Sequence, residues 1–180
     1  MEYMRLSWND IQKQCEYLAK NIRENKVEFD IIVSIARGGW APARILSDIL
    51  DNDELYTVRV KFYEDVGKPR ENPLILHPTQ FDVTGKKVLL VDDIADTGAS
   101  LLTVIKHLEE RKAGNIFVAT LVKKPSSKYT PNLYAMETSA WVIFPWEVRE
   151  TIRSILKGRS RGDASKELKK AGIKEEELEL

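Results

Sequence analysis

Apolar segments of two kinds alternate along the chain, and their alternation predicts strands and helices in turn. Runs rich in β-branched residues and leucine, typical of strands, occur at residues 30–36, 55–61, 88–91, 115–122 and 141–144. Apolar residues at helical spacing occur at residues 7–25, 42–50, 99–112 and 145–156. Strands that alternate with helices predict an α/β fold with a mostly parallel central sheet flanked by helices.

Two of the predicted helices begin with recognisable signals. Ser7 and Asp10 have the residue types and spacing of a capping box, in which each side chain bonds the other residue's backbone N–H. Pro42 stands in the first turn of its helix, where a missing N–H removes no helical hydrogen bond. These residues therefore mark where the two helices start.

A long polar segment, residues 62–82, interrupts the alternation. It contains Pro69, Pro73 and Pro78 and has a single short apolar run at residues 74–76. Proline and polar residues disfavour regular elements, and a connection of this length is uncommon unless it has a function. We predict an excursion from the sheet that is part hairpin and part mobile loop.

The last segment also differs from the rest, because it is rich in Lys and Glu. Short helical patterns occur at residues 164–170 and 174–178, separated at Gly172. We predict a domain of residues 1–156 followed by a charged helical extension of residues 157–180. A solvated appendage is the favoured interpretation of the extension, and a lid or a docking element for a second subunit is the alternative.

Composition indicates a small enzyme of the cytoplasm. The 180 residues suffice for one domain with a full core, and the net charge of +0 argues against a dedicated nucleic-acid binder. The single cysteine, Cys15, cannot form an internal disulfide, as expected in a reducing compartment. No apolar stretch approaches the length of a membrane span, and the N-terminus lacks a signal-peptide core.

The most specific chemistry lies between Val88 and Leu101. Asp92 and Asp93 follow an apolar strand, and the carboxyl ends of strands are where open α/β sheets bind ligands. The turn at residues 96–100 leads into a helix, whose N-terminal N–H groups form a phosphate site. Carboxylates beside a phosphate cradle suit a sugar phosphate, which has both hydroxyls and a phosphate.

This segment resembles the ribose-phosphate signature of type I phosphoribosyltransferases: four apolar residues, two acids, two apolar residues, then Asp-Thr-Gly and a small or hydroxyl residue. The resemblance implies their fold, here with a small hood and a helical C-terminal tail. It also implies that the catalytic acids are Asp96, Asp92 and Asp93, with Asp96 near N7 of a purine. The donor's ribose and 5′-phosphate would be held by Asp92, Asp93, Ala95, Asp96, Thr97, Gly98, Ala99 and Ser100.

A second loop, Ala36 to Gly39, follows a strand and precedes a helix. Gly38 and Gly39 allow the backbone to approach a ligand closely, and Arg37 can donate two parallel hydrogen bonds to a phosphate. In the family this loop binds the pyrophosphate of the donor, often through a non-proline cis peptide. The resemblance implies such a bond between Ala36 and Arg37.

The later segments resemble the base site of the small xanthine–guanine phosphoribosyltransferases. Lys124 corresponds to the lysine that contacts O6 of the purine, and Trp141 to the stacking ring. Val142 would offer backbone groups, and Glu147 stands where the family has Asp. Because lysine only donates hydrogen bonds, Lys124 fits a keto oxygen and not an amine.

The resemblance therefore implies transfer of ribose 5-phosphate from phosphoribosyl pyrophosphate (PRPP) to a 6-oxopurine in purine salvage. The transition state would be oxocarbenium-like, and Mg²⁺ would be held by Asp92 and Asp93. Residues 62–78 match the family's mobile loop, with Tyr63 in place but Phe62 where many members have Ser. The expected partners are PRPP, a purine base and further copies of the chain in a dimer or tetramer, with no nucleic acid and no membrane.

Alternatives remain open at this stage. The same fold can act on another base, such as a pyrimidine or adenine, or serve as a nucleotide-sensing regulator that binds RNA or DNA. A basic stripe formed by the tail lysines would favour the regulator. Among the oxopurines, Glu147 favours guanine if it accepts from the C2 amine, and hypoxanthine if its extra methylene crowds that corner.

Overall fold

The computed structural model describes residues 2–61, 64–65, 68–69 and 73–177. It contains two compact units. The sheet unit comprises Gln12–Thr138, and the tail unit comprises Met1–Ile11 together with Ser139–Leu180. No helix in the described part of the chain is long and apolar enough to cross a membrane.

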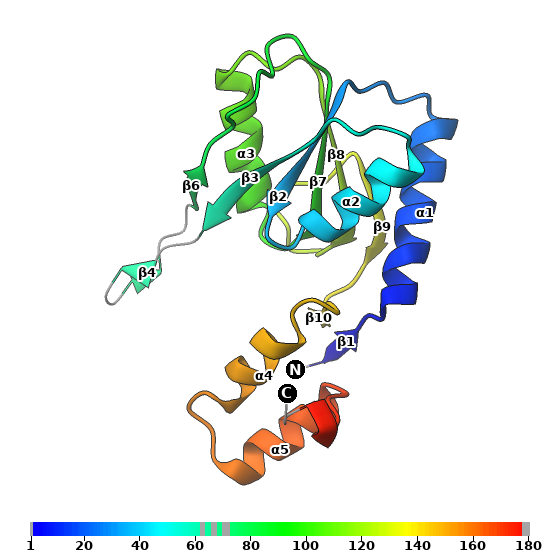
Figure 1. Ribbon diagram of the computed structural model, residues 1–180. Helices are drawn as coiled ribbons and strands as arrows, with labels where there is room; N and C mark the ends of the chain where they lie inside the picture. Colours follow the sequence, from blue (N-terminus) through cyan, green and yellow to red (C-terminus); the bar gives the residue numbers. More distant parts are fainter. Residues whose placement is uncertain (1, 62–63, 66–67, 70–72, 178–180) are drawn as a thin grey trace. The chain divides into compact units, whose positions relative to one another are not determined.

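The sheet unit is built on six strands in the order β6-β3-β2-β7-β8-β9 (Figure 1). Their bounds are β2 (Ile31–Ala36), β3 (Leu55–Lys61), β6 (Leu74–His77), β7 (Val88–Ala95), β8 (Ile116–Lys123) and β9 (Leu133–Glu137). All pairs are parallel except β3 with β6, which is antiparallel and lies at one edge. The predicted mostly parallel sheet is confirmed.

Helices cover both faces of this sheet. Ile31, Val33 and Ile35 alternate along β2 and belong to one apolar cluster with the buried face of α3 (Ala99–Glu110). The residues between them, such as Ile32, are also buried and face the other side, where α2 (Trp40–Ile49) contacts β2 and β7. Both faces of the central strands are therefore apolar, as in other parallel sheets.

The order of the strands reverses next to β2. The chain goes from β2 to β3 on one side, and later places β7 on the other side of β2. Open α/β sheets bind ligands outside the carboxyl ends of the strands at such a point. The loop after β2 and the end of β7 are the two segments that the sequence predicted to bind PRPP, so the topology places them at this position.

Several predicted elements differ in extent from the observed ones. β7 was expected to end at Val91, but it continues to Ala95, so Asp92 and Asp93 lie within the strand and not after it. The backbone ladder to β8 continues through these polar residues, with Asp92 paired to Thr120. Strand β9 was not predicted, because its half-buried residues form neither a continuous apolar run nor a clear alternation.

The excursion after β3 contains the predicted hairpin pairing. β6 returns antiparallel to β3, and the short strands β4 (Glu64–Asp65) and β5 (Lys68–Pro69) pair antiparallel with each other. Tyr63, the residue expected in the mobile loop, lies outside the described residues.

The N-terminal helix α1 (Trp8–Glu24) begins with the predicted capping box. The Ser7 N–H donates to Asp10 Oδ2 at 2.8 Å, and the Asp10 N–H donates to Ser7 Oγ at 3.2 Å. The start of this helix is therefore fixed by side chains of its own sequence.

The tail unit has a small sheet of its own. β1 (Tyr3–Arg5), which was not predicted, pairs parallel with β10 (Trp141–Ile143). The unit continues with α4 (Val148–Leu156), α5 (Arg161–Lys170) and the 3₁₀ turn Glu175–Glu177. β10 was expected as a strand of the central sheet, and its pairing with β1 corrects that prediction.

The charged tail is not a solvated appendage. Ala164, Leu168, Ala171 and Ile173 are buried and form one apolar cluster with residues of α4 and β10. A bidentate ion pair joins Arg5 to Glu177, and the hydrogen bond from Arg5 lowers the pKa of Glu177 to about 2. The few apolar residues of the tail share one buried face. The Lys- and Glu-rich composition of the tail therefore led to the wrong prediction that it is solvated. The boundary expected at residue 156 does not coincide with that of the compact units.

Truncation after Leu156 is therefore expected to destabilise the tail unit, because it uncovers Ile152 and Ile155. The single change Leu168→Ala should lower the free energy of unfolding by about 2–5 kcal/mol. Lys169→Ala, at an exposed position of the same helix, should stay within about 0.5 kcal/mol. Denaturant unfolding of the three proteins measures these changes in the free energy of unfolding. Equal stability of Leu168→Ala and the wild type would contradict the burial of Leu168.

Candidate active site

The loop after β2 lies directly against the end of β7. A Cβ added to Gly38 would lie 1.8 Å from Asp93 Oδ2, so only glycine leaves room for this carboxylate. A Cβ on Gly39 would lie 2.7 Å from the Val91 carbonyl oxygen. The peptide bond between Ala36 and Arg37 is cis, as the family resemblance implies. The structure thus brings the predicted pyrophosphate loop and the predicted ribose acids together.

The two adjacent carboxylates are almost fully enclosed. Asp92 and Asp93 are 7% and 6% exposed, and the Asp93 N–H donates to Asp92 Oδ1 at 3.0 Å. Buried carboxylates require polar partners, and both residues have further interactions in the structure. Their positions are therefore set by the surrounding chain before any ligand binds.

Asp92 and Asp93 are the kind of protein ligand that Mg²⁺ usually takes. Among the described residues, no three His, Cys, Asp or Glu side chains gather in a way that could hold a metal ion. Mg²⁺ is usually held by one or two carboxylates, several waters and the phosphates of a substrate. Asp92 and Asp93 would supply those carboxylates.

The turn from Asp96 to Ser100 forms the start of α3. Gly98 is the N-cap residue with φ of 82°, a conformation that other residues rarely adopt, and Thr97 Oγ1 accepts from the Ala99 N–H at 3.3 Å. Asp96 and Thr97 are exposed. The first N–H groups of this 12-residue helix have no partner within the helix, so they can bind a phosphate.

A segment of which the sequence analysis singled out only Lys124, residues 124–129, packs against this phosphate loop. The Lys124 N–H donates to the Ala95 carbonyl oxygen, and the Lys128 N–H donates to that of Thr97, both at 3.0 Å. A Cβ on Gly98 would lie 2.7 Å from the Tyr129 nitrogen. No motif indicated this contact, because it depends on how two loops from neighbouring strands meet.

The structure distinguishes the two adjacent lysines. Lys123 ends β8, forms an ion pair with Glu137 at 2.6 Å, and lies 5.5 Å from the centre of the Tyr134 ring. Lys124 follows the last residue of β8 and is 9% exposed. The contact of Lys124, the residue that the resemblance selected, with a base stays a prediction.

The other predicted base-binding residues belong to the tail unit. Trp141 is 50% exposed in β10, which leaves ring surface for stacking, whereas Val142 is buried. Glu147 stands at the N-cap position of α4. The joint contact of Lys124 and Trp141 with one base stays a prediction.

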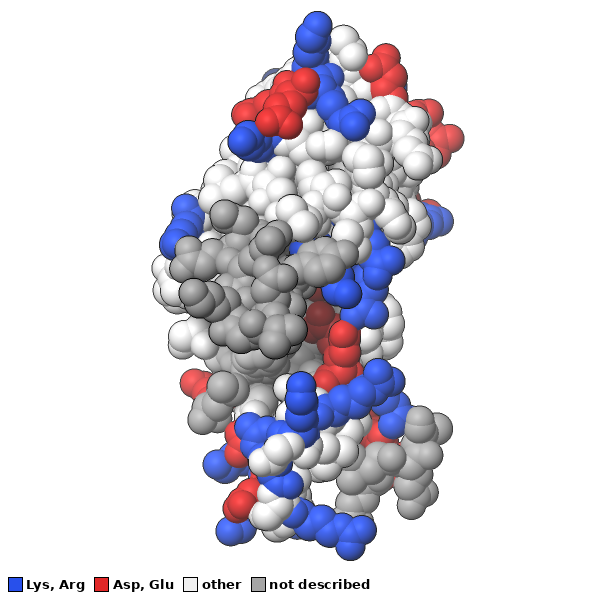
Figure 2. Space-filling view, turned by 90° about the vertical axis from the view of Figure 1, so that its left-hand side faces the viewer, with Lys and Arg blue, Asp and Glu red and all other residues white. Residues whose placement is uncertain are grey.

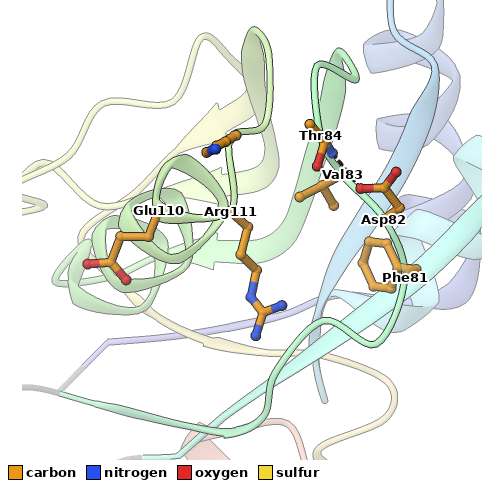
Figure 3. Close-up of a pocket in the computed structure, with 7 residues that line it drawn as sticks. Phe81, Asp82, Val83, Thr84, Glu110 and Arg111 are labelled. Carbon is orange, nitrogen blue, oxygen red and sulfur yellow. Dashed lines mark hydrogen bonds between the residues drawn. The ribbon is translucent and has the colours of Figure 1, made fainter.

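A separate hollow of about 330 Å³ lies elsewhere in the sheet unit (Figure 3). Residues 81–84 and 110–112 line it, and the Thr84 N–H donates to Asp82 Oδ1 at 2.9 Å. Residues 81–84 precede β7, and residues 110–112 include the last residue of α3 and the two that follow it, so the hollow lies at the edge of the sheet where β7 begins. The predicted site lies at the opposite edge, where β7 ends.

The fold and these two loops define a sugar-phosphate transferase of the α/β class, and comparison with known proteins identifies the family. The chain matches the phosphoribosyl transferase domain over residues 6–152 and belongs to that family. It is 30% identical to the xanthine-guanine phosphoribosyltransferase of Desulfotalea psychrophila over 158 residues, which cover 87% of this chain and 93% of that protein. The predicted family is therefore confirmed.

Comparison with solved structures leads to the same family. A purine phosphoribosyltransferase from Pyrococcus horikoshii is 37% identical with a TM-score of 0.73, covering 81% of this chain and 94% of that one. The xanthine-guanine-hypoxanthine phosphoribosyltransferase of Helicobacter pylori is 26% identical with a TM-score of 0.73, covering 85% of this chain and 99% of that one. The chain is thus similar to phosphoribosyltransferases over most of its length.

Proposed function

We propose that this phosphoribosyltransferase transfers ribose 5-phosphate from PRPP to a 6-oxopurine and releases pyrophosphate, in purine salvage. The observation that carries the proposal is the close approach of Gly38 to the Asp93 carboxylate, beside the start of α3. A loop for the pyrophosphate and a loop for the 5′-phosphate then flank two acids, which matches the order of groups along PRPP. The names of the similar proteins support a purine as acceptor.

Each part of the donor has a group to hold it. Arg37 and the backbone at Gly38 and Gly39 would bind the pyrophosphate. The N–H groups and hydroxyls of residues 97–100 would bind the 5′-phosphate. Asp92 and Asp93 would accept hydrogen bonds from the ribose hydroxyls, so that C1 is held in a fixed orientation for the incoming base.

The reaction breaks the bond from C1 to the pyrophosphate and forms a bond from C1 to a purine nitrogen. Positive charge develops on the ribose ring, as in other glycosyl transfers, and the nearby carboxylates stabilise it. Asp96, exposed directly after β7, would hold or accept the proton at N7 of the base. When bound, Mg²⁺ held by Asp92 and Asp93 would offset the charge of the leaving pyrophosphate.

The base preference provides the direct test of the proposed function. Hypoxanthine, guanine or xanthine should be used, and adenine should be rejected by at least about tenfold in kcat/KM. The Lys124 ammonium donates to a keto oxygen at C6, whereas an amine there would leave donor facing donor, at a cost of roughly 1–3 kcal/mol. Nucleotide formed from PRPP and each of the four bases measures the preference.

Variants separate the two base contacts. Lys124→Ala should reduce the preference for oxopurines, and Trp141→Ala should raise KM for all purines alike, because stacking does not depend on the C6 group. Lys106→Ala, an exposed lysine of α3 paired with Glu110, serves as the control. A wild-type protein that used adenine as well as guanine would refute this base site.

A second candidate, a nucleotide-sensing regulator that binds RNA or DNA, is favoured by one observation. Residues 149–174 carry nine Lys and Arg side chains but only three Asp and Glu. Figure 2 shows such basic side chains gathered over the surface of α4 and α5, with acidic ones among them. Binding of RNA or DNA without transfer to any base would support this candidate over the enzyme.

The setting that we propose is the cytoplasm, with the chain in a dimer or tetramer, as the family resemblance implies. The single cysteine, Cys15, is buried, and burial raises the pKa of its thiol to about 12. A buried thiol with a raised pKa is unreactive, so Cys15 acts as a small apolar residue of the core.

A further inference from the structure

The N-terminal segment lies along the segment that contains the proposed stacking residue. Within the tail unit, β1 pairs with β10 in register from Tyr3 with Trp141 to Arg5 with Ile143. The Trp141 N–H donates to the Glu2 carbonyl oxygen at 2.8 Å, and the Leu6 N–H donates to that of Ile143 at 3.0 Å. The backbone of the stacking strand is therefore held by residues 2–6.

An aromatic contact extends this support beyond the strand. The ring of Trp8 lies 5.6 Å from that of Trp146 at an interplanar angle of 54°. Trp146 in turn stacks on Phe144, at 5.0 Å and 8°. Phe144 is fully buried, so it anchors one end of this series of rings, and Trp8 covers the other end.

Trp8 itself has a fixed position but little burial. It is the first residue of α1, directly after Ser7 of the capping box, which determines where the helix starts. Trp8 is 59% exposed, so its removal takes little apolar surface out of the core. The contribution of Trp8 is therefore mainly its contact with Trp146.

Two of the three ring residues, Phe144 and Trp146, belong to a tight turn. The Glu147 N–H donates to the Phe144 carbonyl oxygen at 3.0 Å, which closes the turn between β10 and α4. This turn connects Trp141, the proposed stacking residue, to Glu147, the residue expected near C2 of the base. A shift of Trp146 would move the turn, because Trp146 belongs to it and its ring contacts those of Phe144 and Trp8.

We propose that Trp8 is a positioning residue for the base: it holds Trp146, and through it the turn at residues 144–147, without contacting the substrate. The inference rests on the proposed function. It assigns to the start of α1 a role in recognition of the base and none in binding of PRPP.

The test uses the full chain and the variants Trp8→Ala, Trp8→Leu and Trp8→Phe. In Trp8→Ala and Trp8→Leu, KM for guanine should rise roughly three- to tenfold, while KM for PRPP and kcat stay within about twofold. Trp8→Phe keeps a ring and should restore most of the affinity for the base. Tyr17→Ala removes another exposed aromatic residue of α1 and should change neither KM.

A purely structural role predicts a different outcome. Loss of fold integrity would lower kcat or raise both KM values together, and either result overturns the proposal, as does an unchanged KM for guanine. If Trp8→Ala does not fold, the kinetics of Trp8→Leu test the proposal, because leucine keeps an apolar side chain at this position but has no ring. Transfer by the wild-type enzyme tests the proposed function separately, and calorimetry with GMP tests the role of Trp8 without turnover.

Discussion

Replacing Asp96 by Asn is expected to lower kcat by about 10²–10⁴-fold with little change in KM for PRPP. Asp96 is exposed at the end of β7, beside the start of α3. The amide has nearly the same size as the carboxylate, but it cannot take the proton from N7. Loss of the Asp96 carboxylate therefore raises mainly the free energy of the transition state, in which that proton moves.

Two comparisons separate this effect from a general loss of charge. Asp92→Asn and Asp93→Asn should raise KM for PRPP and weaken use of Mg²⁺, because both carboxylates face the donor in the proposed site. Asp51→Asn, at an exposed position with φ of 55° that Asn also tolerates, should leave the kinetics unchanged. Steady-state kinetics measures all four variants, and a kcat of Asp96→Asn within a few-fold of the wild type would make Asp96 a turn residue only.

The sheet unit could be predicted well because each of its central strands is recognisable from its own local sequence. A strand buried on both faces is apolar at nearly every position, so 30–36 matched β2 and 115–122 matched β8 to within one residue at each end. The position next to β2 where the strand order reverses is a consequence of that order. The alternation of strands with helices restricts the strand order but does not determine it. The ribose acids and the pyrophosphate loop were then predicted from motif chemistry and from the family resemblance, and the structure brings them into contact.

The tail unit could not be predicted in the same way, because its elements depend on each other. β1 has three residues and pairs with β10, which lies far from it in the sequence, and no local pattern specifies that partner. The apolar face of α5 has only Ala164 and Leu168, which become buried because α4 and β10 cover them. Whether such a short amphipathic helix buries its apolar face depends on tertiary contacts, which the local sequence does not specify.

The predicted site also shows where motif reasoning ends. The family resemblance selected Lys124 for the base, and its contact with a base stays a prediction. Motif reasoning did not find the packing of residues 127–129 on Gly98, which determines the shape of the phosphate loop from outside. Contacts between loops of adjacent strands depend on backbone geometry, which residue types alone do not give.

The two glycines of the pyrophosphate loop should respond differently to a single methyl group. In Gly38→Ala the new Cβ meets the Asp93 carboxylate, which is a side-chain group and not backbone, so the strands need not shift and the fold should be retained. The displaced carboxylate should lower kcat/KM for PRPP by about 10²-fold, the effect expected when a group in an active site moves by roughly 1 Å.

In Gly39→Ala the Cβ meets the Val91 and Ile35 carbonyl oxygens at 2.7 Å and 2.8 Å and the Asp92 Cα at 2.9 Å. These are backbone atoms of the two central strands, so the strands themselves must shift. The free energy of unfolding should fall by about 2–4 kcal/mol, in addition to a loss of activity. Gly162→Ala, in α5 with no atom within 4 Å of the added Cβ, should keep full activity and gain about 0.5–1 kcal/mol. Denaturant unfolding and kinetics with PRPP are measured on all three proteins. Full activity in Gly38→Ala would show that the Asp93 carboxylate can leave its place without consequence, and that Asp93 therefore does not hold the donor.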